Sequence, residues 1–274
     1  MELYDQWCRA ETEDESLTAY LLVDAAQIQQ DIDWLSVLEA SKGRNLCWGY
    51  PEAEHPDVGV LLLHRHTTVA DDLLQEWLAH YPFAFTSLFS DWRFSRLAKA
   101  LHQRFLGKLT DGQTVFIRYA DAAAMWHWQH VLESYQWERL LAVAQVWQCV
   151  GRDGGLMQFK GNIQKRHAYP EPILSKEQLA QLHQLCLPDR VEAGLRQNGY
   201  VPVSFNPFDL YQAVNKVAVL LERIGLLTES RLYRVLGVLL PNNINEVENN
   251  AFKQLFIDNI SAPELLAAIE AYLD

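Results

Sequence analysis

Two aspartates follow predicted strands at positions where a ligand or a metal ion could bind. Asp24 ends the β-prone run Thr18–Val23, and Asp121 follows the strand predicted over Thr114–Tyr119. Open α/β sheets bind ligands at the carboxyl ends of their strands, and two carboxylates there could hold Mg²⁺ or act as acid and base. Each aspartate could equally cap the helix that follows it, and Gln27 would complete a capping box with Asp24. Because neither is followed by the glycine-rich turn of a phosphate site, capping is favoured.

Histidines are also able to do chemistry, but their spacing supports no site. His64 and His66 share one face of a predicted strand, and His127 and His130 are neighbours on a predicted helix. Zinc needs further ligands, usually from an HExxH helix or cysteine pairs, and neither pattern is present. We expect His64 and His66 to be exposed at a strand end and His127 to be packed. The sequence also lacks a Gly-x-Ser-x-Gly turn, so we predict no catalytic residue, no metal and no cofactor.

Basic residues gather in one predicted helix, over residues 91–108, whose apolar stripe faces a core. The bases are Arg93, Arg96, Lys99, Arg104 and Lys108. The first forty residues, by contrast, are strongly acidic. Two interpretations stay open: the bases form a solvated face that pairs with this acidic segment, or they form a docking surface for an acidic partner.

The composition excludes several classes of function. Lys and Arg number 23 against 35 Asp and Glu, which gives a net charge of −12. Since binding to nucleic acids and to anionic membranes depends on Lys and Arg, we expect neither. With four cysteines far apart in sequence, and neither a secretory signal nor an apolar run long enough to cross a bilayer, we expect a cytoplasmic protein with reduced thiols.

The first 150 residues alternate between strand and helix patterns. Strands are predicted over residues 18–23, 58–63, 83–89 and 114–119. Helices are predicted over residues 28–38, 69–77 and 91–108, and again from residue 122. This alternation is typical of a sheet with helices packed on it.

After Pro172 the pattern is helical only. Capping residues mark the starts of three helices at Ser175, Asn206 and Ser261. All nine tryptophans precede this part of the chain. We therefore predict an α+β protein of two lobes: an α/β lobe over 1–150 with a mixed sheet flanked by helices, a linker over 151–172 rich in turn residues, and an all-helical lobe over 173–274.

Four segments of the first lobe occur in a distinctive order. They are Ala19–Ala25, Thr86–Ser90, the helical stretch Leu97–Leu106 with His102 and Arg104, and Leu109–Asp121. In this order they resemble the type VI secretion effector adaptors, also called effector chaperones, which are known as a domain of unknown function. The stretch from Asp111 resembles the motif dG-x-x-v-l-f-R-f-y-D-P-R of that family. Arg118 and Asp121 match it, whereas Ala122 and Ala123 replace its Pro-Arg pair.

The resemblance implies a protein without catalysis that binds a toxic effector in the cytoplasm of a Gram-negative bacterium. Such adaptors help load the effector onto the valine-glycine-repeat spike protein of the secretion tube. We expect Asp24, Arg118 and Asp121 to have structural roles, with Arg118 and Asp121 paired. The expected partner contacts are Arg93, Arg96, Lys99 and Arg104.

Two other functions remain open. One is a small α/β metal-dependent hydrolase or phosphotransferase that uses Asp24 and Asp121. The other is a structural baseplate component that assembles with itself.

Overall fold

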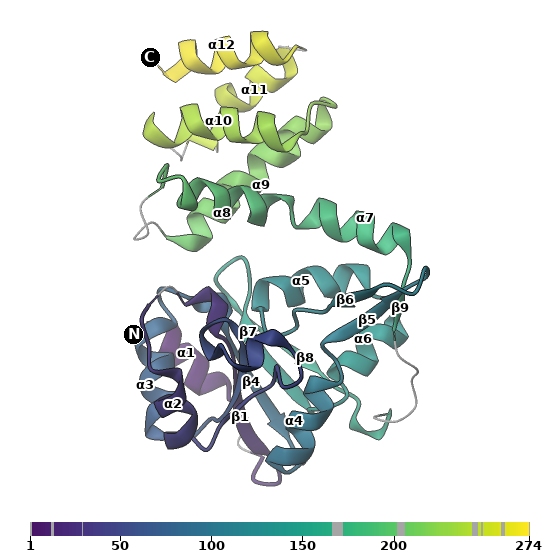
Figure 1. Cartoon of the computed structure of the whole chain (residues 1–274). Helices are drawn as coiled ribbons and strands as arrows, with labels where there is room; N and C mark the ends of the chain where they lie inside the picture. Colours follow the sequence, from purple (N-terminus) through teal and green to yellow (C-terminus); the bar gives the residue numbers. More distant parts are fainter. Residues whose placement is uncertain are drawn as a thin grey trace. The chain divides into compact units, whose positions relative to one another are not determined.

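The chain divides into two compact units, Met1–Leu182 and His183–Asp274. The computed structural model describes residues 2–11, 14–28, 30–165, 172–201, 206–242, 246–247, 249–258 and 261–273. Figure 1 shows strands and helices in the first unit and helices in the second. The boundary between the two units follows Leu182, later in the chain than the linker expected over 151–172. Residues 156–160 of that expected linker form a strand.

A six-stranded sheet forms the centre of the first unit, with the order β2-β3-β1-β4-β7-β8. Its strands are β1 (Thr18–Asp24), β2 (Arg44–Asn45), β3 (Val60–His64), β4 (Phe85–Ser90), β7 (Val146–Val150) and β8 (Leu156–Lys160). Every neighbouring pair is antiparallel. The strands predicted from residues 18, 58 and 83 are therefore present, and all of them belong to this one sheet.

Helices cover both faces of this sheet. As a result, every residue of the central strand β4 is buried. Ser87 and Gln148 lie opposite each other in the ladder and both bond to Trp7, on α1 (Glu2–Ala10). Leu88 and Trp147 point to the opposite face, where the Trp147 indole donates to a carbonyl of α6 (Ser134–Leu141). Alternate residues of one strand thus pack against different helices, which produces three layers.

The remaining helices of the sheet-bearing unit follow the strands in turn. They are α2 (Trp34–Ala40), α3 (Thr68–Trp77), α4 (Phe94–His102), α5 (Ala122–Val131) and α7 (Lys176–Leu185), whose last three residues belong to the second unit. The helix predicted over 28–38 starts only at Trp34, where Asp33 caps it by accepting from Ser36 N–H at 3.1 Å. Before it, the chain forms a short 3₁₀ helix over Ala25–Gln27.

A second, three-stranded sheet has the order β6-β5-β9. Its strands are β5 (Leu106–Leu109), β6 (Thr114–Phe116) and β9 (Ile173–Leu174). The predicted hairpin is present: β5 and β6 are antiparallel, and Gly112 takes a φ of 86° in the turn, a conformation that favours glycine. The pairing of β5 with β9 is parallel, so the mixed pairing predicted for this lobe is found here and not in the main sheet.

The second unit is a stack of helices around one apolar core. They are α8 (Leu187–Gln197), α9 (Pro207–Arg223), α10 (Glu229–Asn242), α11 (Asn250–Asp258) and α12 (Ala262–Leu273). The predicted cap at Asn206 is present, since its Oδ1 accepts from Phe208 N–H at 2.8 Å. Buried Val214, Leu236 and Phe252 belong to the core. Within the described part of the chain, none of the helices has both the length and the apolar content needed to cross a membrane.

Candidate functional site

The three residues of the sequence motif meet at one end of the main sheet. Arg118 Nη2 lies 2.7 Å from Oδ2 of Asp24, the last residue of β1, and 3.9 Å from Oδ2 of Asp121. The Asp24 side chain is only 4% exposed, whereas that of Arg118 is 56% exposed. The expected pairing of Arg118 with Asp121 is present, but the shorter contact is with Asp24.

This arrangement shifts the ionisation of both partners. Burial raises the pKa of the Asp24 carboxyl, the positive charge of Arg118 lowers it, and the negative charge of Asp121 raises it again. Burial lowers the pKa of Arg118, but the two carboxylates outweigh burial and the net pKa is raised. The arginine therefore stays charged and offsets the cost of an acid buried at the strand end.

The two aspartates differ as helix caps. Asp121 caps α5, because its Oδ1 accepts from Ala123 N–H at 2.9 Å and from Ala124 N–H at 3.1 Å. Asp24 does not cap the helical turn after it, so the capping box predicted with Gln27 is wrong. The Gln27 amide instead donates to Asp24 Oδ2 at 3.2 Å. Arg118 donates to the same oxygen at 2.7 Å from a cationic group, which attracts the carboxylate more strongly than the neutral amide of Gln27 does.

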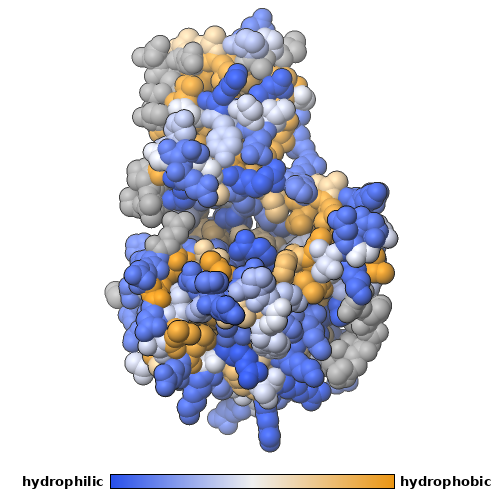
Figure 2. All heavy atoms as spheres, in the orientation of Figure 1, coloured by the Kyte–Doolittle hydropathy of each residue, from blue (hydrophilic) through white to orange (hydrophobic). Residues whose placement is uncertain are grey.

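A cavity of about 290 Å³ opens beside this ion pair. Its apolar wall includes Val58, Val60, Phe105, Phe116 and Ile117. Its charged lining consists of Asp24, Glu52 and Arg118. Val58 is 49% exposed and Phe116 55%, so the apolar wall is partly open to solvent. Figure 2 shows apolar residues at the surface of the first unit, over the region of β5 and β6.

Aromatic rings continue from the cavity across the surface. Phe116 meets Tyr50 edge-on with ring centroids 5.5 Å apart, and Tyr50 lies 5.5 Å from His102. His102 in turn stacks on Trp48 at 4.1 Å. Half-exposed Trp and Tyr side chains are enriched where proteins bind other proteins. His102 and Phe116 lie in segments that resemble the family, whereas Tyr50 does not. The sequence indicated contacts among none of the three, because the folded hairpin is needed to bring them together.

The predicted basic helix is shorter than expected, and this changes its surface. It ends at His102, so Arg104 and Lys108 lie outside it. Arg104 is buried and donates to the carbonyls of Ala100 at 2.8 Å and Arg139 at 3.0 Å. Each carbonyl lies in the last turn of a helix, α4 or α6, where basic side chains are favoured. The prediction of Arg104 as an exposed partner contact is therefore wrong.

The other three bases named as partner contacts are exposed. Arg93 immediately precedes α4 and its side chain makes no capping bond, and Lys99 lies in the last turn of the helix. The Arg96 guanidinium lies 4.4 Å from the centre of the Trp92 ring. Two acids among the described residues of the first forty form ion pairs elsewhere, Glu11 with Arg65 and Asp24 with Arg118.

Arg65 is a charged centre that sequence reasoning missed. It is 1% exposed, contacts Glu11 Oε1 at 2.6 Å, and also binds Asp71 on α3. Its only signal in the sequence is its position immediately after the apolar strand that became β3. The flanking histidines are placed differently: His66 is exposed as expected, while His64 is half-buried and stacks on Phe94 at 4.8 Å.

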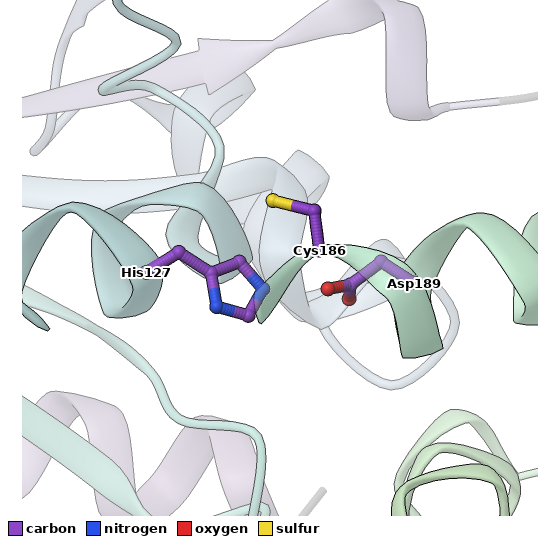
Figure 3. A group of neighbouring side chains, drawn as sticks. All are labelled: His127, Cys186 and Asp189. Atoms are coloured by element: carbon purple, nitrogen blue, oxygen red, sulfur yellow. The ribbon is translucent and has the colours of Figure 1, made fainter. Parts of the chain in front are cut away.

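His127 is buried, as the sequence indicated, and lies on α5 of the first unit. Burial and the positive charge of Arg152 lower its pKa to about 4, against the opposing effect of Asp121. Figure 3 draws His127 with Cys186, which immediately precedes α8, and Asp189, which lies in the first turn of α8; both belong to the second unit. Because these residues come from different units, we assign no metal site to them.

Comparison with known proteins gives one match. A family model described as "Domain of unknown function (DUF4123)" matches residues 19–139. Neither a curated protein nor a solved structure matches the chain. The matched range begins in β1 and ends within α6, and every residue that lines the cavity lies inside it. The cavity and the Asp24–Arg118 ion pair thus belong to the part of the chain that this family model describes.

Proposed function

We propose that this protein is a type VI secretion adaptor, which binds a toxic effector in the cytoplasm and helps load it onto the valine-glycine-repeat spike protein without catalysis. The match of residues 19–139 to the DUF4123 family model carries the proposal, together with the resemblance of Arg118 and Asp121 to the motif of such adaptors. The aromatic side chains beside the cavity support it, because they offer apolar area to a partner.

The alternative function, a hydrolase or phosphotransferase that uses a metal at Asp24 and Asp121, has weaker support. One guanidinium nitrogen of Arg118 lies within 4 Å of both carboxylates and so competes with a cation for the same oxygens. Metal sites built on carboxylates depend on those oxygens being open to the ion.

The proposal is tested by co-expression with the product of the adjacent gene, followed by size-exclusion chromatography with light scattering. We expect one stable complex of defined stoichiometry. Titration of the spike protein into this complex then tests loading. If the chain binds no effector, the adaptor proposal fails.

A thermal melt with Mg²⁺ or Mn²⁺ tests the enzyme alternative, because a ligand that binds only the folded state raises its stability. We expect no change in melting temperature. A rise that is lost in Asp24→Asn and in Asp121→Asn would favour the enzyme. Asn also caps helices well, so Asp121→Asn leaves the start of α5 supported.

A further inference from the structure

The short strand β6 has one hydrogen-bonding edge that faces away from its sheet. Among the described strands, β6 pairs with β5 alone. Ile117 N–H donates to Phe105 and Gln113 C=O accepts from Leu109, so residues 113, 115 and 117 face β5. Backbone groups alternate in an antiparallel ladder, and those of Thr114 and Phe116 must therefore point outward.

The sequence of β6 contains none of the residues that usually prevent another strand from pairing with an exposed edge. Proteins usually protect an edge strand with proline or with charged side chains, whereas β6 reads Thr-Val-Phe. Thr114 and Phe116 are both exposed, and Phe116 also lines the cavity described above. A partner residue that binds along β6 can thus place its side chain in the cavity.

A segment that lines the cavity together with Phe116 of β6 is acidic. Residues 51–58 read Pro-Glu-Ala-Glu-His-Pro-Asp-Val, with three carboxylates and neither lysine nor arginine. Glu52 lines the cavity, and Glu54 and Asp57 are exposed beside it. The charge of Arg118 is largely offset by Asp24 and Asp121. The remaining acids make the opening of the cavity attract a cation more than an anion.

We propose that the outer edge of β6 and the adjacent cavity bind an extended segment of the effector, in which an apolar side chain fills the cavity and a neighbouring Lys or Arg meets Glu52, Glu54 or Asp57. The segment adds as a strand, because only an extended backbone can exchange hydrogen bonds with both Thr114 and Phe116. A helix satisfies its own backbone groups and would leave this edge unpaired. The identity of the partner rests on the adaptor function proposed above.

Proline substitution separates strand addition from folding. Thr114→Pro removes an N–H that points outward, so the ladder with β5 keeps its bonds, and proline is tolerated on such an edge. The matched control is Thr68→Pro, at the first position of α3 after the Thr67 cap, where proline is also tolerated. We expect both variants to melt like the parent. Thr114→Pro should weaken binding of the co-expressed effector about tenfold or more, whereas Thr68→Pro should leave it unchanged.

Charge reversal tests the second half of the proposal. We expect Glu52→Lys combined with Asp57→Lys to weaken binding about tenfold at low salt and less at high salt. Asp72→Lys combined with Glu15→Lys, at two exposed acids away from the cavity lining, changes the net charge by the same amount and is the control. Phe116→Asp should weaken binding at every salt concentration, because it puts a charge against the apolar side chain.

The outcomes separate the two proposals. If the parent chain binds the effector and Thr114→Pro binds as well as Thr68→Pro, the binding surface assigned here is wrong while the adaptor function stands. If the parent chain binds no effector, both proposals fail. A dimer of the chain alone that Thr114→Pro dissociates would show that this edge joins two copies of the chain, and would also overturn the proposal.

Discussion

Two arginines of the first unit each contact two carboxylates, but in opposite surroundings. At Arg65 the cation is the buried member, 1% exposed, while its partner Asp71 is 44% exposed. At Arg118 the acid is the buried member, and the arginine side chain is 56% exposed. A buried guanidinium has its donors committed to the fold, whereas an exposed one keeps donors available to a partner. Arg65 therefore ties elements together, and Arg118 lines the cavity with part of its side chain open to solvent.

The largest effect is expected at the buried cation. Arg65→Met should lower the free energy of unfolding by about 3–5 kcal/mol, because Glu11 would be left mostly buried without its counter-ion. Urea unfolding at pH 7 measures the loss. A loss below that of Arg118→Gln would contradict the contrast drawn between the two sites.

A smaller loss is expected at Arg118, since its side chain is half exposed. Arg118→Gln should cost about 2–3 kcal/mol at pH 7. Without the arginine, burial raises the pKa of Asp24 further above its value in the unfolded chain, about 3.9. Stability of the variant should therefore fall as pH rises above about 4, and the difference from the parent should shrink at pH 4.

The double variant Arg118→Gln with Asp24→Asn is the control for this effect. It removes the buried charge together with its partner, so most of the lost stability should return, and the added pH dependence should disappear. If the double variant is no more stable than Arg118→Gln, the loss comes from packing and not from the uncompensated carboxylate.

His127 is a third buried titratable side chain of the first unit, but its charged neighbour Arg152 has the same sign as the protonated ring. The folded state keeps this ring neutral down to about pH 4, whereas the unfolded chain takes up a proton near pH 6.5. Stability should therefore fall as pH is lowered through this range, by about 2 kcal/mol between pH 7 and pH 5. Urea unfolding of His127→Gln should lack this component, and His130→Gln, at an exposed position on the same helix, should retain it.

The smallest effect on stability is expected on the exposed face of α4. Arg93→Glu with Arg96→Glu should leave the melting temperature close to that of the parent. If this face docks an acidic partner, such as an acidic surface of the spike protein, the double variant should associate more slowly at low salt. Association rates that are unchanged across salt concentrations would support the solvated-face interpretation.

The strands of the main sheet could be predicted because each is an apolar run bounded by turn residues. β1 and β4 follow this pattern closely. The end of α4 could not be predicted, because Phe105 continues the apolar spacing of that helix while the chain turns into β5. The helix ends where tertiary contacts begin. Arg104 donates to the carbonyl of Ala100 in α4 and to the carbonyl of Arg139 in another helix, α6.

Only part of the candidate site could be predicted, for a similar reason. The pairing of Arg118 with Asp121 spans three residues and can be read from the sequence. Asp24 and Arg118 are 94 residues apart, and local capping was the simpler interpretation of Asp24. The boundary between the units was expected too early in the chain. The turn residues after Gly151 join β7 to β8 within one sheet and do not mark a linker between units.

The contacts of α1 have a consequence for the order of events during synthesis. The carbonyl of Trp7 accepts from Gln148, 141 residues later, and that of Ala10 accepts from Gln158, 148 residues later. The site that receives α1 is thus completed only after β7 and β8 have left the ribosome. Contacts this distant in sequence slow folding, since the chain between them must be ordered before they form. A nascent chain that has emerged as far as α6 therefore exposes the apolar strands that Trp7 later covers. General chaperones have the largest apolar surface to bind at this stage.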